Sequence, residues 1–121
     1  MKVIIAGAAG RMGRELLKYA HQNADIDIIG ASEESSSDWV GKDIGEVIGE
    51  ANMNIKIVSD ILELIKSADV IIDFTNPETT LANAVLAAQA RISHIIGTTG
   101  FQNEEIESLK KAGNHAVLVQ S

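Results

Sequence analysis

Apolar and polar residues follow one another in blocks that predict strands and helices in turn. Short, uninterrupted apolar runs are typical of buried strands, whereas longer stretches with apolar residues three and four positions apart are typical of helices. Because the two kinds of block alternate, the pattern predicts a parallel sheet covered on both faces. The predicted strands are 2–7, 25–31, 55–58, 69–74, 93–97 and 116–120.

Four helices are expected between these strands. In the first, Met12, Leu16 and Ala20 share one apolar stripe. The third is expected to start with a proline, which has no N–H to lose at the first helical position. The helices are predicted to follow the first strand, to cover 60–68, to begin at Asn76–Pro77 and to run from Glu104 to Lys111.

Right-handed crossovers between such strands give an α/β fold, a Rossmann-like doubly wound parallel sheet in a three-layer α/β/α arrangement. The 121 residues suffice for one domain, 1–121. Residues 32–43 include three consecutive serines and show no periodicity, which predicts a mobile surface loop. Because a strand ends the chain, we expect a first domain cut off at its boundary.

Composition narrows the possible partners. The chain has 17 acidic and 10 basic residues and a formal net charge of −7, which argues against a nucleic-acid surface. There is no cysteine, so disulfides and thiolate metal sites are excluded. No apolar run approaches the ~20 residues of a membrane span. The first residues do not form a signal peptide, so we expect a cytoplasmic protein with no membrane partner.

The segment VIIAGAAGRMGR carries the first candidate chemistry, because it follows a strand and opens a helix. Gly7 allows a tight turn, Gly10 lets a pyrophosphate approach backbone N–H groups, and Gly13 lets the helix pack closely on the sheet. Arg11 and Arg14 offer positive charge to a phosphate. The alternative is a glycine turn without a ligand, but the strand–turn–helix context favours a bound anion.

An acidic pair follows the second predicted strand. Glu33 lies about 20 residues after the glycines, where a carboxylate accepts hydrogen bonds from an adenosine ribose. Glu34 is next to it, and two carboxylates repel a 2′-phosphate, which favours NAD(H) over NADP(H). The alternative is a solvated acidic loop.

Two further segments, DFTNPETT and GTTGF, also follow strands and are expected at the same sheet edge. Thr75, Thr98 and Thr99 offer hydroxyl groups there, and Gly97 permits close backbone approach. The alternative for either segment is ordinary turn and capping chemistry.

Other titratable residues are interpreted as structural. Asp73 ends a buried strand and is expected to cap the turn after it. His21, His94 and His115 are scattered without metal-ligand spacing, so no metal site is predicted. No nucleophile–base pair is apparent, and no catalytic residue is assigned.

Together, GAAGRMGREL, DFTNPETTL and IGTTGF, in this order, resemble the N-terminal domain of the dihydrodipicolinate reductases. The resemblance covers essentially all of the chain. It implies an NAD(P)H-dependent reductase that transfers a hydride to a cyclic dicarboxylate in the diaminopimelate route to lysine. Matched by position, the cofactor-binding residues are Gly7, Ala8, Ala9, Gly10, Arg11 and Met12 for the pyrophosphate, Glu33 for the ribose, and Gly97, Thr98 and Thr99 beside the nicotinamide.

The chain departs from the family pattern in two respects. Family members often carry an arginine where this chain has Glu34, which puts NADPH use in doubt and favours NADH. The family's catalytic histidine, substrate-binding lysine and tetramer-forming sheet belong to a C-terminal domain, so the resemblance implies a homotetrameric parent enzyme and an inactive isolated chain.

Three other functions fit part of the pattern. An aspartate-dehydrogenase-like oxidoreductase has a similar nucleotide domain, although the threonine-rich loop favours the reductase. A non-catalytic nucleotide-sensing module would use the same pocket. A CoA-binding domain would use similar glycines but gives no reason for an acid at Glu33.

Overall fold

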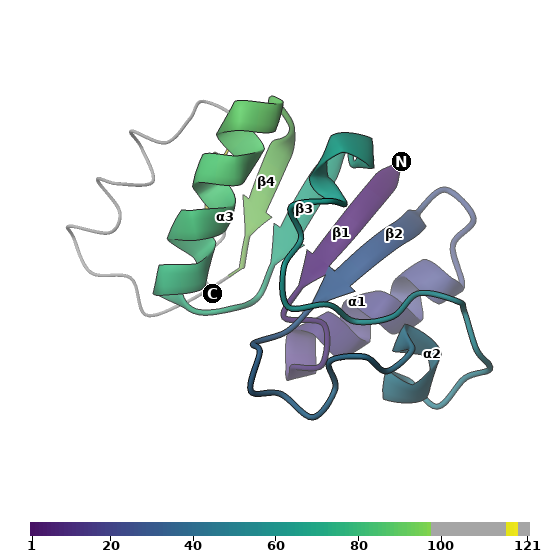
Figure 1. Ribbon diagram of the computed structural model, residues 1–121. Helices are drawn as coiled ribbons and strands as arrows, with labels where there is room; N and C mark the ends of the chain where they lie inside the picture. The colour runs from purple at the N-terminus through teal and green to yellow at the C-terminus, as the bar shows by residue number, and fades with distance from the viewer. Residues whose placement is uncertain (98–115, 119–121) are drawn as a thin grey trace.

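A single parallel sheet organises the protein, in a computed structural model that describes residues 1–97 and 116–118 (Figure 1). The strand order in the described part is β2-β1-β3-β4-β5. The order reverses between β1 and β3, which is the point where sheets of this kind bind ligands. The strands are β1 Lys2–Ala6, β2 Asp27–Ser32, β3 Val70–Asp73, β4 Ser93–Ile96 and β5 Ala116–Leu118.

Helices cover both faces of the sheet. Alternate residues of a strand point to opposite faces, and in β1 both sets are apolar and buried over residues 3–6. Val3 and Ile5 of β1 pack in one core cluster with α1 and α2. Ile4 and Ala6 pack in the other cluster with η1 and α3. This confirms the three-layer arrangement. The helices are α1 Arg11–His21, α2 Ile44–Val47, the short 3₁₀ helix η1 Ile65–Ser67 and α3 Pro77–Ala90.

The prediction of a strand at 55–58 is wrong. This segment makes only isolated bridges, a parallel one between Ser32 and Val58 and an antiparallel one between Asp43 and Lys56. The Val58 N–H donates to Ala31 O at 3.0 Å, so the segment extends the sheet beyond β2 for little more than one residue. On its other side the segment pairs with the antiparallel residues around Asp43, again through a single bridge. Neither pairing is long enough to form a strand.

The prediction of a helix over 60–68 is also wrong, since only η1 is helical there. Asp60 Oδ1 accepts the Leu62 N–H at 2.9 Å, a local turn that competes with helix formation. Conversely, α2 was not anticipated, because four residues are too few to show a period. Its N-cap is Asp43, whose carboxylate accepts the Gly45 N–H at 2.8 Å.

The apolar stripe of α1 differs from the expected one. Ala20 is buried and Leu16 packs against the core as expected, but Met12 is 56% exposed, and the helix also buries Gly13 and Leu17. A Cβ on Gly13 would lie 2.2 Å from Gly7 O, so close contact with the turn fixes which side of the helix faces inward.

The loop at 32–43 is irregular as expected, but Trp39 and Val40 pack against the core and anchor it. The helix predicted from Glu104 to Lys111 lies outside the described residues.

Candidate functional site

The carboxyl ends of β1, β2 and β3 surround a pocket of about 350 Å³. Its walls come from three separate parts of the chain: the glycine turn after β1, the acidic pair after β2 and the residues after β3. A larger neighbouring pocket of about 590 Å³ shares Glu33, Glu34, Thr75 and Asn76. The sheet topology therefore brings together most of the segments that the sequence singled out.

Two of the three glycines are required by the fold itself. Gly7 has a φ of +80°, and a Cβ there would lie 2.6 Å from Phe74 O. Gly13 permits the helix to contact the turn, rather than the sheet as the sequence analysis expected. Both positions would carry glycine whether or not a ligand binds.

Gly10 is different. Its φ of −74° and ψ of 174° are open to any residue. Leaving out its chain neighbours, a Cβ there would meet only one atom of the described residues within 4 Å, Gly7 O at 3.4 Å. Gly10 is exposed and lines the 350 Å³ pocket. The fold does not demand a glycine here, so its absent side chain leaves space that a ligand can use.

The backbone N–H groups of the turn divide into two sets. Those of Gly7 and Ala8 donate to Ser32 O at 3.0 and 3.1 Å, and that of Gly10 donates to Gly7 O. The N–H groups of Arg11, Met12 and Gly13 precede the first helical hydrogen bond, in which the Arg14 N–H donates to Gly10 O at 2.9 Å, so they have no carbonyl partner within the helix. No side chain in the described part of the chain caps this end, and its first turn contains no acidic residue. The site thus presents free donors and the positive end of a helix dipole, which fits an anionic group such as a pyrophosphate.

The backbone of Ala9 is held by two side chains. Its N–H donates to Glu33 Oε2 at 2.8 Å, and its carbonyl accepts from Arg14 Nε at 2.7 Å. The Arg14 guanidinium also lies 5.3 Å from the centre of the Trp39 ring, within cation–π range. Arg14 therefore supports the turn through its Nε. Glu33 has at least a structural role in holding this turn, beside the ribose contact expected of it.

The acidic pair is linked to the third wall of the pocket. Asn76 Nδ2 donates to Glu34 Oε1 at 2.8 Å, and Asn76 Oδ1 accepts the Thr79 N–H at 2.9 Å as the N-cap of α3. One side chain thus fixes the start of α3 and joins it to the loop after β2.

Phe74 connects three of the loops at this edge. Its backbone lies against Gly7, and a Cβ on Gly97 would lie 2.5 Å from its ring. Gly97 therefore accommodates an aromatic side chain. Thr98 and Thr99, which the sequence also placed here, lie outside the described residues.

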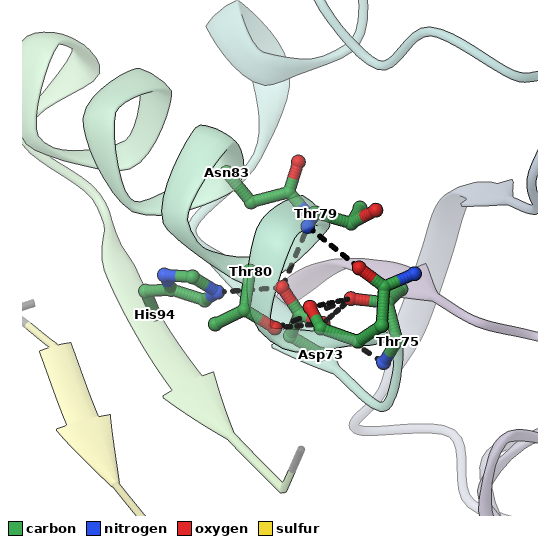
Figure 2. Close-up of polar contacts among 7 residues, drawn as sticks. Asp73, Thr75, Thr79, Thr80, Asn83 and His94 are labelled. Carbon is green, nitrogen blue, oxygen red and sulfur yellow. Dashed lines mark hydrogen bonds and ion pairs between the residues drawn. The ribbon is translucent and has the colours of Figure 1, made fainter. Parts of the chain in front are cut away.

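A polar cluster centred on the buried Asp73 (Figure 2) adjoins the pocket, since its member Thr75 lines it. Asp73 Oδ1 accepts from the Thr75 N–H at 3.0 Å and from the Thr75 hydroxyl at 2.5 Å. The Thr75 hydroxyl, expected to face a ligand, is thus turned toward Asp73. Among the described residues, the carboxylate also contacts Thr80 Oγ1 at 3.0 Å, Asn83 Nδ2 at 2.9 Å and His94 Nε2 at 3.0 Å.

The protonation of Asp73 follows from this environment. Burial raises the pKa of its carboxyl, but hydrogen bonds from His94, Thr75 and Asn83 outweigh that effect and hold the pKa below its ordinary value of 3.8. The expectation that Asp73 caps the turn after β3 is confirmed. Asp73 also holds α3 and β4, which was not expected. Sequence reasoning missed Thr80 and Asn83, whose signal was two polar residues at helical spacing on the inner side of α3.

No group of three or more histidines and carboxylates that could hold a metal occurs within residues 1–97 and 116–118. In the same part of the chain, no helix has the length and apolar character needed to cross a membrane.

Comparison with solved structures gives the fold. A dipicolinate-bound dihydrodipicolinate reductase from Paenisporosarcina sp. TG-14 superimposes with a TM-score of 0.69 at 23% identity, over 93% of this chain and 42% of that one. Aspartate semialdehyde dehydrogenase II from Vibrio cholerae gives a TM-score of 0.68 at 15% identity, over 97% and 37%. At these identities the likeness concerns the Rossmann-like architecture alone.

Comparison of sequences gives the family. A protein of Ruegeria pomeroyi named 4-hydroxy-tetrahydrodipicolinate reductase is 42% identical over 119 residues, 98% of this chain and 44% of its own length. One of the same name from Parvibaculum lavamentivorans is 43% identical over 122 residues, 100% of this chain and 45% of its own length. The chain thus spans less than half of these relatives.

The family described as "Dihydrodipicolinate reductase, N-terminus" matches residues 1–121, the whole chain. Both the sequence motifs and the sheet topology agree with this match. The chain belongs to the N-terminal domain family of the dihydrodipicolinate reductases.

Proposed function

We propose that residues 1–121 are the dinucleotide-binding domain of a 4-hydroxy-tetrahydrodipicolinate reductase, and that the 350 Å³ pocket binds NAD(P)H. The observation that carries this proposal is the uncapped start of α1 beside Gly10, where free N–H groups and open space meet. Membership of the reductase family supports a pyridine nucleotide as the anion.

The proposed cofactor-binding residues have different roles, which follow from their contacts. Gly7, Ala8 and Ala9 shape the turn, because their N–H groups are bonded within the protein. Gly10 leaves room for the pyrophosphate, and the backbone of Arg11 and Met12 donates to it. Glu33 accepts from the adenosine ribose, and Gly97, Thr98 and Thr99 border the nicotinamide.

The reduced nicotinamide supplies a hydride, and the proposed acceptor is a cyclic dicarboxylate of the diaminopimelate route. We assign no catalytic residue within 1–121, because the family's catalytic histidine and substrate-binding lysine match no residue here. The proposed parent is a cytoplasmic homotetramer assembled through a further domain. We expect this chain to bind cofactor without turnover, so steady-state reductase activity of the chain alone would contradict the assignment.

The proposed preference is for NADH, because Glu34 places a second carboxylate beside Glu33 where a 2′-phosphate would lie. Calorimetric titration of the chain with NADH and then NADPH, at one salt concentration, tests this. We expect NADH to bind at least about tenfold more tightly, a difference of about 1.4 kcal/mol. Equal or tighter binding of NADPH would contradict the preference.

Two variants separate charge from the contact with Asn76. Glu34→Gln keeps an oxygen that accepts from Asn76 Nδ2 but removes the negative charge. It should therefore reduce the difference in affinity between NADH and NADPH. Glu34→Arg should reduce this difference further or make NADPH the tighter ligand, since a guanidinium pairs with a 2′-phosphate.

The ribose role of Glu33 needs its own control, because this carboxylate also holds Ala9. Glu33→Gln keeps an acceptor for the Ala9 N–H, whereas Glu33→Ala removes it. Weaker NADH binding in both variants is expected if the carboxylate contacts the ribose. A loss confined to Glu33→Ala would show that Glu33 acts only by holding the turn.

A further inference from the structure

The buried Asp73 carboxylate ties together three parts of the fold. Its partners lie on the loop after β3, on the first two turns of α3 and on β4 (Figure 2). Asp73 and His94 are 0% and 1% exposed, so neither side chain can contact a ligand directly. The proposed nucleotide binding leaves this cluster without a role.

The cluster nevertheless determines the position of one wall of the pocket. Thr75 donates both its N–H and its hydroxyl to Asp73, which fixes the backbone that follows β3. The preceding residue, Phe74, lies against Gly7 on one side and Gly97 on the other. Phe74, Thr75 and Asn76 all line the 350 Å³ pocket. A shift of Asp73 would therefore move the contact between this wall and the glycine turn.

The contact with His94 links Asp73 to β4, the strand that leads to Gly97. An ionised carboxylate only accepts hydrogen bonds, so Nε2 must carry the proton. His94 Nδ1 is buried and has no hydrogen-bond partner among the described residues.

From this arrangement we infer that Asp73 and His94 are positioning residues for the nucleotide pocket. The His94 Nε2–H orients the Asp73 carboxylate, and Asp73 holds the Phe74–Asn76 wall against the glycine turn. The inference rests on the proposed function, because its consequence is a change in NADH affinity.

The test compares His94→Gln with His94→Met in the chain. The two replacements have similar size and shape, but only glutamine has an N–H that can donate to Asp73. Circular dichroism selects a temperature at which wild type and variants are folded, and calorimetry then measures NADH affinity. We expect His94→Gln to bind nearly as wild type and His94→Met to bind about tenfold more weakly.

A second readout distinguishes positioning from general stability. Nitrogen-15 NMR of the His94 ring should show the Nε2–H tautomer in the free chain, and its signal should shift when NADH binds. If His94→Met does not fold, Thr80→Ser and Thr80→Val give the same comparison, since only serine keeps the hydroxyl that donates to Asp73.

The binding measurements distinguish failure of the proposed function from failure of this inference. Absence of NADH binding by the wild-type chain would overturn the proposed function, and this inference with it. Binding by wild type with equal affinities in the folded glutamine and methionine variants, or a ring protonated on Nδ1 alone, would overturn the inference and leave the proposed function standing.

Discussion

Individual residues at this site differ in what requires them. Gly13 is demanded by packing, because a Cβ would lie 2.2 Å from Gly7 O and 2.8 Å from the backbone of Ala8. These neighbours are backbone atoms that cannot move aside without distorting the turn. Gly10 meets no such obstacle, so the same glycine spacing contains both structural and open positions.

We therefore predict that Gly13→Ala destabilises the chain by about 1–3 kcal/mol, the usual cost of forcing an extra carbon into a packed site. Urea denaturation followed by circular dichroism measures the free energy of unfolding. Wild-type stability in Gly13→Ala would show that the turn and helix are less tightly packed than described.

Asp73 makes stability depend on pH. Its folded pKa is lowered below 3.8, so its contribution is complete at pH values above that ordinary pKa and is lost as the pH falls through the folded pKa. We predict that the free energy of unfolding falls as the pH is lowered from about 5 to about 2, a range that brackets the ordinary carboxyl pKa of 3.8.

In Asp73→Asn, part of this dependence should disappear. Stability at neutral pH should drop by about 1–3 kcal/mol, because one of the two acceptor oxygens becomes an NH2 group that faces buried donors. Asp43 should still contribute to the pH dependence, because the effect of burial on its pKa is outweighed by backbone hydrogen bonds from Met53, Gly45 and Ile55, which lower it. Parallel stability curves for wild type and Asp73→Asn would contradict the assignment of an ionised, stabilising Asp73.

At the scale of elements, α3 shows what a hydrophobic pattern can and cannot predict. Its start at Asn76–Pro77 was predictable, since a capping side chain and a proline are local signals. Its buried side was not, because Thr80 and Asn83 are buried to satisfy Asp73, a residue that pattern analysis treats as separate. Val85, an apolar residue of the same helix, is 49% exposed.

The strands were predicted well wherever both faces are buried, as in β1 and β3. The segment 55–58 looks the same in sequence but lies at the end of the sheet, where its pairing depends on partners elsewhere in the chain. A single sequence does not show how far such a ladder extends.

The N-cap of α3, Asn76, is expected to contribute to the stability of the chain. Asn76→Ala should cost about 1 kcal/mol of unfolding free energy, the usual value for a lost cap. Asn76→Asp keeps an oxygen for the Thr79 N–H and should retain most of that stability, although it faces Glu34 with a like charge. Equal losses in the two variants, measured by urea denaturation, would contradict the capping role.

At the scale of the whole molecule, the strand order explains why residues far apart in the sequence form one site. Because β1 lies between β2 and β3, the glycine turn, the acidic pair and the Phe74–Asn76 wall meet at one edge (Figure 1). The sequence predicted this convergence from parallel topology alone. It did not predict the side-chain links that hold the edge together, such as Asn76 to Glu34, because those depend on rotamers and loop paths.

A chain with a net charge of −7 repels anions at long range, so dinucleotide binding must come from the local donors at the start of α1. This is the central claim, and Gly10→Ser tests it most directly. Serine is a favoured N-cap, so the variant should be as stable as wild type or slightly more stable. Its side chain would occupy the open space and accept from the N–H groups assigned to the pyrophosphate.

The decisive measurement is calorimetric titration of wild type and Gly10→Ser with NADH, alongside their unfolding free energies. We predict unchanged or higher stability in Gly10→Ser together with at least about tenfold weaker binding, equivalent to about 1.4 kcal/mol. NADH binding of equal strength in the two proteins would show that the segment is a glycine-rich connection and that the dinucleotide binds elsewhere.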